Sequence, residues 1–191
     1  MSPILVINIL LFQPFMEQTT ITLAVFARFG KEILDEIAVA VQRELHCKVS
    51  IKEVYLDLSS YFDPGRRQYN GDQLLKMVNS MEFNGSTKVI ALFNVDLFIP
   101  ILTYIFGQAQ LGGRTAIASA FRLSNMSYGI EDGDTRLSDR FKKEIIHELG
   151  HLFGLMHCHT PNCVMRSSTY VEDIDQKEQA FCSKCSSELH L

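Results

Sequence analysis

Apolar residues recur along the first half of the chain in a pattern that predicts three buried strands separated by two helices. Short, β-rich apolar runs at residues 4–12, 48–58 and 87–94 are typical of strands. Residues 26–45 carry apolar side chains at helical spacing, and a second helix is expected to end near Met81. This strand–helix–strand–helix–strand order favours parallel strands joined by helical crossovers.

Side chains that these segments turn inward form the expected core. Asn70 or Asp72 is the expected N-cap of the second helix, because short polar side chains accept hydrogen bonds from the first free backbone N–H groups. Residues 63–67 contain a Pro-Gly pair and predict a turn. The expected core positions are Ile33, Leu34, Ile37, Val41 and Leu45 in the first helix, Val49, Ile51 and Val54 in the strand that follows, and Leu74, Leu75 and Val78 in the second helix.

Two further extended runs, residues 102–111 and 115–123, are separated by Gly112 and Gly113. A Gly-Gly pair between β-like runs predicts a tight hairpin, so one antiparallel strand is expected at the edge of an otherwise parallel sheet. The backbone groups of such an edge can pair with an extended peptide, or the hairpin can serve only to complete the sheet. The local sequence favours neither role over the other.

A polar segment, residues 124–138, leads into the last long helix that the pattern predicts. We interpret this segment as a solvated connector rather than a functional lid. Ser138 is the expected N-cap, and the helix is predicted to run from Asp139 to Leu155. The residues expected to dock this helix are Ile145, Ile146, Leu149, Leu152 and Phe153.

The size and charge of the chain narrow its functional class. It has 191 residues, of which 47% are hydrophobic, and this suits one well-cored domain. The net charge of −4 and the lack of a basic block argue against a nucleic-acid partner. No apolar stretch reaches the length of a membrane-spanning helix, and the start has no basic region of the kind that begins a secretory signal. We therefore expect a cytoplasmic protein with no membrane partner, and we expect a monomer.

The strongest chemical signal is a group of three histidines in and just after the last predicted helix. His147 and His151 are four residues apart, so a helix presents both imidazoles on one face, within reach of one ion. Gly154 can adopt φ > 0, which would let the chain turn back and bring His157 round as a third ligand. Glu148 lies beside the first ligand, where it can take a proton from a zinc-bound water without ligating the metal.

A second ligand set follows directly. The pairs Cys158-x4-Cys163 and Cys182-x2-Cys185 can each present two thiolates to one tetrahedral ion, and the four complete a closed structural site. Two disulfides are the alternative, but they need an oxidising compartment. The remaining cysteine, Cys47, is interpreted as a small buried hydrophobe. Because Cys158 directly follows the third histidine, the two metal sites would share a few residues of backbone.

The motif HExxHxxGxxH with a downstream methionine resembles the metzincin metallopeptidases. The added cysteines, which extend the pattern to Cys185, make it similar to the archaemetzincins in particular. Upstream segments at residues 96–100, 106–109 and 119–123 are also similar to that family, so the resemblance is expected to span most of the chain.

This resemblance implies an α/β fold, with a five-stranded mixed sheet, an antiparallel edge strand and a zinc-binding active-site helix. Residues 1–191 would form a single metallopeptidase domain. Within it, residues 1–156 would make the upper subdomain of sheet and helices, and residues 157–191 would make an irregular C-terminal subdomain stapled by zinc. An active-site cleft would lie between the two.

The resemblance also implies a role for each residue of the motif. His147, His151 and His157 would bind a catalytic zinc ion, and Glu148 would act first as general base and then as general acid. Met165 would form the Met-turn, whose thioether packs beneath the metal site. The four cysteines would hold a second, structural zinc ion, and the substrate would be a peptide or a protein.

Two other functions fit parts of the pattern. A zinc-stabilised domain could bind peptides without cutting them, but such a module has no need for a base at Glu148. A nucleic-acid-binding module could be built on the cysteines, but the acidic charge balance argues against it. His159 and Tyr170 lie near the expected sites, and the sequence assigns neither of them a role.

Overall fold

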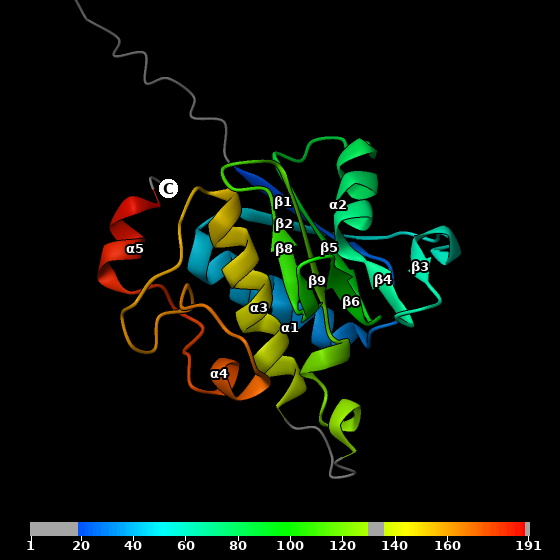
Figure 1. Ribbon diagram of the computed structural model, residues 1–191. Helices are drawn as coiled ribbons and strands as arrows, with labels where there is room; N and C mark the ends of the chain where they lie inside the picture. Colours follow the sequence, from blue (N-terminus) through cyan, green and yellow to red (C-terminus); the bar gives the residue numbers. More distant parts are fainter. Residues whose placement is uncertain (1–18, 130–135, 190–191) are drawn as a thin grey trace, which may run out of the picture.

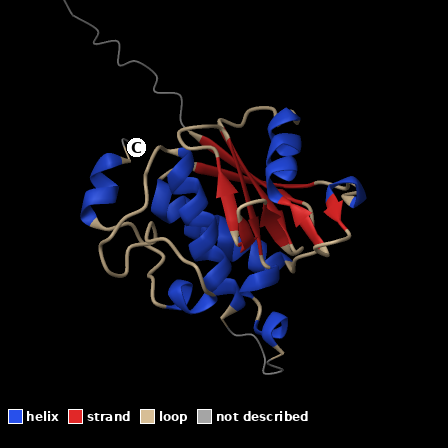
Figure 2. Ribbon diagram, in the orientation of Figure 1, coloured by secondary structure: helices blue, strands red, loops and turns tan. Residues whose placement is uncertain are grey.

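The computed structural model describes residues 19–129 and 136–189, which form a mixed α/β fold around one five-stranded sheet (Figures 1 and 2). The strand order is β2-β1-β5-β9-β8, in which the first four strands are parallel and β8 is antiparallel to β9. The predicted mixed sheet with an antiparallel edge strand is therefore confirmed. A second, smaller sheet has the order β3-β4-β6-β7.

The elements have the following bounds. The strands are β1 (Thr20–Val25), β2 (Lys48–Glu53), β3 (Phe62–Asp63), β4 (Gln68–Asn70), β5 (Lys88–Phe93), β6 (Leu97–Ile99), β7 (Leu102–Ile105), β8 (Gly107–Ala109) and β9 (Thr115–Ser119). The α-helices are α1 (Lys31–Leu45), α2 (Gly71–Ser80), α3 (Leu137–Leu152), α4 (Val171–Asp175) and α5 (Ser183–Glu188), and short 3-10 helices are η1 (Ser59–Tyr61), η2 (Phe121–Leu123) and η3 (Asn125–Tyr128). None of the helices in the described ranges is long and apolar enough to cross a membrane.

Alternate residues of the central strands supply two separate hydrophobic cores. In β5, Ile90 and Leu92 belong to the core that α1 and α3 cover, whereas Val89, Ala91 and Phe93 belong to the core that α2 covers. Figure 1 shows α1 and α3 on one face of the sheet and α2 on the other. Because both faces are covered, β5 is apolar from Val89 to Phe93, as a buried parallel strand requires.

The second helix and the hairpin agree with the sequence prediction. Asn70 caps α2, since its side-chain Oδ1 accepts a hydrogen bond of 3.1 Å from the N–H of Gln73. The predicted inward positions of α2 are all buried. In the hairpin, β8 pairs with β9 so that Gln108 lies opposite Ile117, and Gly112 adopts φ 63° in the turn. The left-handed backbone explains the need for glycine at that position.

The sequence prediction omits β1, an inner strand of the large sheet. Thr20 and Thr22 interrupt its apolar pattern, yet Thr22 is buried, because its hydroxyl finds a partner 2.9 Å away in the hydroxyl of Ser50 on β2. The strand predicted at residues 4–12 lies outside the described residues.

The first helix is predicted to begin too early. It begins at Lys31 rather than at residue 26, because the chain stays extended after β1: the N–H of Phe26 donates to the carbonyl of Leu92 at 2.9 Å. The next strand, β2, ends at Glu53 rather than at residue 58. It is the outer strand of the sheet, and Ile51, which was expected to face inward, is exposed there.

Residues 102–111 form two strands rather than one. β7 belongs to the small sheet and β8 to the large sheet, and the buried Phe106 separates them. The small sheet also uses residues 62–63 and 68–70, on either side of the predicted turn. Strands of two or three residues carry too little periodic signal to be predicted, and pairing between distant segments creates them.

Helix α3 differs from its prediction at both ends. It begins at Leu137, and Ser138 is not its cap, because the Ser138 hydroxyl donates to Glu36 of α1 at 2.8 Å. It ends at Leu152 rather than at Leu155. The carbonyls of its last turn are satisfied by the hairpin and by a lysine: Gly112 N–H donates to His151, and Lys88 Nζ donates to Leu152, each at 2.8 Å.

A buried arginine ties the C-terminal part of the chain to α3. Arg140 is 4% exposed, and its Nε and Nη2 each donate to the carboxylate of Asp175, at the end of α4, at 2.7 Å. Its Nη1 donates to the Leu123 carbonyl and to Asn125 Oδ1, each at 2.8 Å. Such bidentate, charge-assisted contacts fix orientation as well as distance.

We predict that Asp175→Asn destabilises the protein by about 2–4 kcal/mol, because it leaves the buried guanidinium without its counter-charge. Asp35→Asn is the matched control; it breaks the exposed Lys31–Asp35 pair and should leave the unfolding midpoint unchanged. The Arg140 guanidinium holds the pKa of Asp175 below its ordinary value. The stability difference between wild type and Asp175→Asn should therefore persist above about pH 4 and shrink in more acidic solution. Chemical denaturation across pH measures both effects, and an equal loss in the two variants would contradict the assignment.

Candidate metal centre

The first group of predicted ligands is brought together at the end of α3. His147 and His151 lie one turn apart, His147 buried and His151 half-buried, with ring centroids 4.7 Å apart. Gly154 takes φ 92°, and the chain reverses there, as predicted. The reversal places the ring of His157 5.3 Å from that of His147 and 5.0 Å from that of His151. One nitrogen from each of the three imidazoles lies within 4.8 Å of those of the others.

Backbone carbonyls fix the protonation of the two helical histidines. Nδ1 of His147 lies 2.8 Å from the carbonyl oxygen of Val164, and Nδ1 of His151 lies 2.7 Å from that of Leu155. A carbonyl oxygen only accepts, so each Nδ1 carries the proton and each Nε2 presents a lone pair. The two Nε2 atoms are 3.1 Å apart. Two lone pairs that face each other at this distance repel, unless a cation lies between them; the donor set therefore fits a zinc ion.

The surroundings of these imidazoles favour their neutral form. Burial lowers the pKa of His147 well below its ordinary value, and the positive charge of Lys177 acts in the same direction. Burial likewise lowers the pKa of His151 and of His157. Neutral imidazole is the form that binds metal, so the protein environment favours the ligand form before any ion arrives.

Glu148 is buried next to the histidines and forms a pair with a second carboxyl group. It is hydrogen-bonded to Glu144, which lies one turn earlier on α3. Burial raises the pKa of Glu148 well above its ordinary value, and the neighbouring Glu144 raises it further. Gly107 of β8 lies directly over this side chain, since a Cβ atom there would be 2.7 Å from Glu148 Cγ. Only glycine allows the edge strand to come so close.

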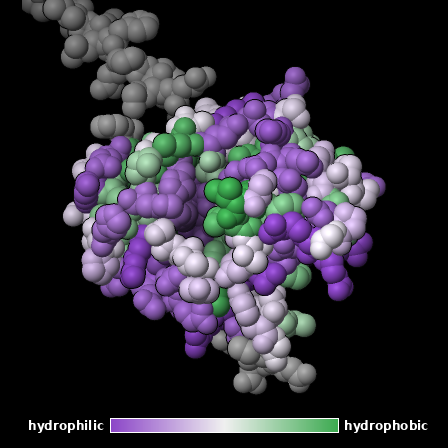
Figure 3. Space-filling model, in the orientation of Figure 1, coloured by the Kyte–Doolittle hydropathy of each residue, from purple (hydrophilic) through white to green (hydrophobic). Residues whose placement is uncertain are grey.

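A cavity of about 370 Å³ opens beside His147 and His157. Its walls are the edge segment of residues 102–107, the segment of residues 167–170, and side chains of α3 that include Glu148 and His147. Figure 3 shows that the surface over β8 carries a compact group of hydrophobic side chains next to a largely hydrophilic surface. The cavity therefore combines an apolar strand edge with buried carboxyl and imidazole groups.

Met165 packs beneath the histidines. It is fully buried, and its sulfur lies against Gly150 of α3, where any side chain would collide with it. Its neighbour Val164 supplies the carbonyl that holds His147, and the Met165 carbonyl accepts a hydrogen bond of 2.9 Å from the N–H of Cys158. The methionine is therefore part of the segment that orients two of the histidines.

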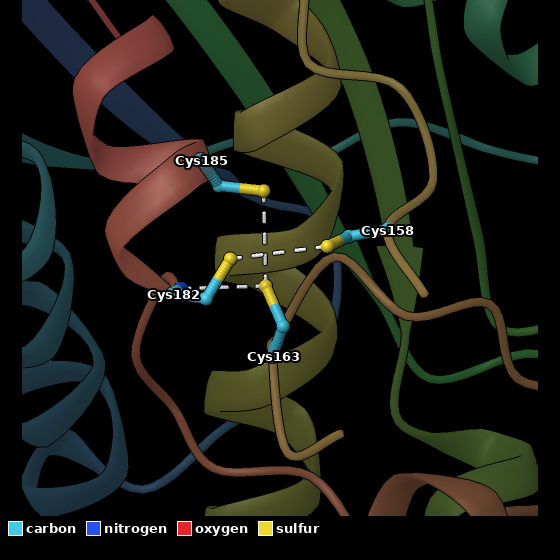
Figure 4. A group of neighbouring side chains, drawn as sticks. All are labelled: Cys158, Cys163, Cys182 and Cys185. Atoms are coloured by element: carbon cyan, nitrogen blue, oxygen red, sulfur yellow. Dashed lines mark hydrogen bonds between the residues drawn. The ribbon is translucent and has the colours of Figure 1, made fainter. Parts of the chain in front are cut away.

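The four C-terminal cysteines form a second group (Figure 4). Cys158 and Cys163 come from the loop after α3, Cys182 and Cys185 from the start of α5, and their side chains point toward one another. The Sγ atoms of Cys158 and Cys182 are 3.8 Å apart, as are those of Cys163 and Cys185. All four thiols are free.

The sulfur separations fit a tetrahedral ion and do not fit disulfides. Ligands at a Zn–S distance of about 2.3 Å place tetrahedral sulfur atoms about 3.8 Å from one another, whereas bonded sulfur atoms are about 2.05 Å apart. The backbone N–H of Cys185 lowers the pKa of Cys182 to about 6, which favours the thiolate that binds metal. Cys47 is buried away from this group, as predicted.

Sequence reasoning missed several residues at the first site. Glu144 precedes Glu148 by four residues, so helical spacing alone predicts that the two carboxyl groups share a face. Lys177 and Gly107 carry no local signal, because tertiary contacts bring them to the cavity. His159 belongs to neither ligand group within the described part of the chain, and Tyr170 lines the cavity.

Comparison with known proteins agrees with this chemistry. A model of peptidase family M54 matches residues 14–191. The archaemetzincin of Haloquadratum walsbyi is 32% identical over 157 residues, which cover 81% of this chain and 90% of the relative. The archaemetzincin of Pyrococcus abyssi is 39% identical over 134 residues, which cover 68% of this chain and 71% of the relative.

Solved structures show the same fold. The crystal structure of archaemetzincin from Methanopyrus kandleri has a TM-score of 0.80 and 31% sequence identity, and the match covers 93% of this chain and 96% of that chain. A zinc-dependent peptidase from Methanocorpusculum labreanum has a TM-score of 0.79 and 29% identity, over 89% of this chain and 100% of that chain. The chain therefore belongs to peptidase family M54 and is a zinc metallopeptidase of the archaemetzincin type.

Proposed function

We propose that this chain hydrolyses peptide bonds at a zinc ion held by His147, His151 and His157, with Glu148 as the general base. The observation that carries the proposal is the convergence of three neutral imidazoles, two with their Nε2 lone pairs directed at one point, beside a buried carboxyl group at the wall of a cavity. The substrate is a peptide or a protein, and the working unit is a monomer.

The ion supplies two kinds of chemistry when bound, since it lowers the pKa of a water ligand toward about 7 and polarises the substrate carbonyl. Glu148 takes the proton from the attacking water and later gives it to the leaving amine. Burial and the neighbouring Glu144 raise the pKa of Glu148. The carboxyl group can therefore hold the proton between the two transfers. The three imidazoles stay neutral throughout, and His147 and His151 keep their Nδ1 protons on backbone carbonyls.

The edge strand β8 supports a role in substrate binding rather than in sheet completion alone. It is the last strand of the large sheet, and Gly107 lies against Glu148. A peptide that adds to this edge as a further strand would pass beside the proton-transferring carboxyl group. Gly154 and Met165 support the site by turning the chain and by packing beneath α3.

We further propose that Cys158, Cys163, Cys182 and Cys185 hold a second, structural zinc ion, so that each chain binds two. The sulfur separations support it, and so does the position of the loop they close. Cys158 follows His157 directly, and Cys163 precedes the Val164 carbonyl that holds His147. The second ion therefore stabilises the segment that orients the catalytic ligands.

The rival functions receive less support. A peptide-binding module would not need the buried Glu148 beside the histidines, since burying a carboxyl group has a free-energy cost. A nucleic-acid module would need a basic surface, and the chain carries a net charge of −4.

We predict that Glu148→Gln retains both zinc ions and the fold but lowers kcat/KM for peptide hydrolysis by about 10²–10⁴-fold, because glutamine cannot accept the proton. The matched control is Glu82→Gln, at an exposed position on the opposite face of the sheet. Fluorogenic-peptide turnover and metal analysis measure the two readouts. Unchanged turnover in Glu148→Gln would overturn the role of Glu148.

We also predict that Cys182→Ser lowers the zinc content from about two ions to about one per chain, because three thiolates and a hydroxyl hold zinc weakly. The variant should lose peptidase activity as well, although no cysteine belongs to the catalytic ligand set, since a loosened loop displaces His157 and Val164. Cys47→Ser, at the remaining cysteine, should keep both ions. Mass spectrometry under native conditions counts the metal, and two retained ions in Cys182→Ser would contradict the structural site.

A further inference from the structure

A buried lysine lines the catalytic cavity without a close counter-charge. Lys177 is 4% exposed, and its Nζ donates a single long hydrogen bond, 3.4 Å to the Val164 carbonyl. Among the described residues no carboxylate oxygen lies within 4.0 Å of this Nζ. The nearest acidic groups, Glu144 and Glu148, are instead hydrogen-bonded to each other. An ammonium group has three donors, so two of them are left for another partner.

A second polar group in the same cavity has no hydrogen-bond partner within the described part of the chain. The hydroxyl oxygen of Ser168 is buried and makes no hydrogen bond within the described part of the chain. Ser168 and Lys177 both line the cavity that His147, His157 and Glu148 share. Buried polar atoms are nearly always hydrogen-bonded. A hydroxyl without a partner and an ammonium group with two spare donors therefore point to a ligand that supplies the acceptors.

We propose that Lys177 and Ser168 form a carboxylate-binding subsite of the catalytic cavity, and that the enzyme therefore prefers substrates with a carboxylate next to the cleaved bond. The proposal deepens the peptidase function and rests on it. The ammonium of Lys177 supplies the charge, and the Ser168 hydroxyl donates a second hydrogen bond. Both donors match one carboxylate group with two oxygens.

The composition of the cavity favours a carboxylate over larger anions. Lys177 is the only lysine among the described residues that line it, and no arginine does, whereas phosphate recognition commonly uses arginine or several cations. The volume of about 370 Å³ also has to accommodate the reacting bond at the histidines, so the bound carboxylate lies close to that bond. Two sources satisfy this chemistry: the side chain of an Asp or Glu residue, or the free C-terminal carboxylate of a short peptide.

A purely positioning role for Lys177 is the alternative. Its hydrogen bond to the Val164 carbonyl could only support the loop that holds His147. In that role, removal of the lysine would weaken cleavage of all peptides by the same factor. In a carboxylate subsite, removal changes the ratio between acidic and neutral peptides, and this ratio separates the two roles.

The test is a fluorogenic peptide library in which each position carries either Glu or Gln, prepared with a free or an amidated C-terminus. The zinc-loaded wild type should cleave the best carboxylate peptide about 10- to 100-fold faster, in kcat/KM, than its uncharged twin. The Glu/Gln pairs report a side-chain carboxylate, and the acid/amide pairs report a C-terminal one. Measurable cleavage at equal rates within every pair would overturn the proposal.

Lys177→Met removes the charge and keeps the length of the side chain. It should reduce the acidic preference to about one, whereas Lys76→Met, at an exposed lysine on α2, should leave the preference unchanged. Ser168→Ala should lower the preference by about 3- to 10-fold, because one neutral hydrogen bond is lost. It should leave thermal stability unchanged, since the hydroxyl has no partner to lose. Retained preference in both cavity variants would overturn the proposal, and the serine variant decides if the lysine variant does not fold.

Binding separates failure of the subsite from failure of the peptidase function. The zinc-loaded Glu148→Gln protein should bind the carboxylate peptides about 10- to 100-fold more tightly than their uncharged twins, as measured by fluorescence anisotropy. This result would support the subsite even if wild type cleaved none of the peptides. Equal affinities would reject the subsite while leaving peptide hydrolysis untouched.

Discussion

The segment from His157 to Met165 is the constraint on which the rest of the site depends. It begins with a histidine of the first ligand group, continues directly into the first cysteine, and ends in the methionine that packs under α3. A hydrogen bond from Cys158 N–H to the Met165 carbonyl closes it into a loop. The geometry of the four cysteines thereby sets the position of the Val164 carbonyl. That carbonyl selects which nitrogen of His147 is free to bind metal. The two ligand groups are therefore structurally coupled, because the nine residues from 157 to 165 contain members of both.

Helix α3 makes this unit possible by burying polar side chains along most of its length. Near its start Arg140 meets Asp175, and further along Glu144 meets Glu148. The last turn presents the histidines. Each of these groups would be costly to bury alone. Arg140 and His147 find their partners in the C-terminal region, at Asp175 and Val164, whereas Glu144 and Glu148 are paired with each other within the helix. Helix α3 and the C-terminal region therefore stabilise each other. These contacts explain how C-terminal residues with little regular structure keep a fixed position against α3.

The parts of this architecture that the sequence predicted are those encoded by local spacing. Histidines four residues apart on a helix must share a face, a glycine three residues later permits the reversal, and paired cysteines chelate. The Gly-Gly hairpin and the cap at Asn70 are local for the same reason. The strand β1 was missed because its threonines break the apolar pattern. Thr22 can be buried because its hydroxyl pairs with those of Ser50 and Ser86. Lys177 could not be predicted either, because its position in the sequence does not indicate which residues it contacts in the fold.

The cavity also contains two polar side chains, Lys177 and Ser168, whose hydrogen-bonding capacity the folded chain does not satisfy. Folding selects against unsatisfied buried donors, so a site that keeps them has a use for them outside the folded chain. At Gly107 the structure omits a side chain so that the edge strand can reach Glu148. At Lys177 and Ser168 it keeps side chains for which the folded chain supplies only one long hydrogen bond. The first feature brings a peptide backbone to the reacting groups whatever its sequence, and the second can distinguish one peptide from another. Catalysis and selectivity thus draw on different segments of one cavity: α3 and the edge strand serve the first, and the C-terminal residues Ser168 and Lys177 serve the second.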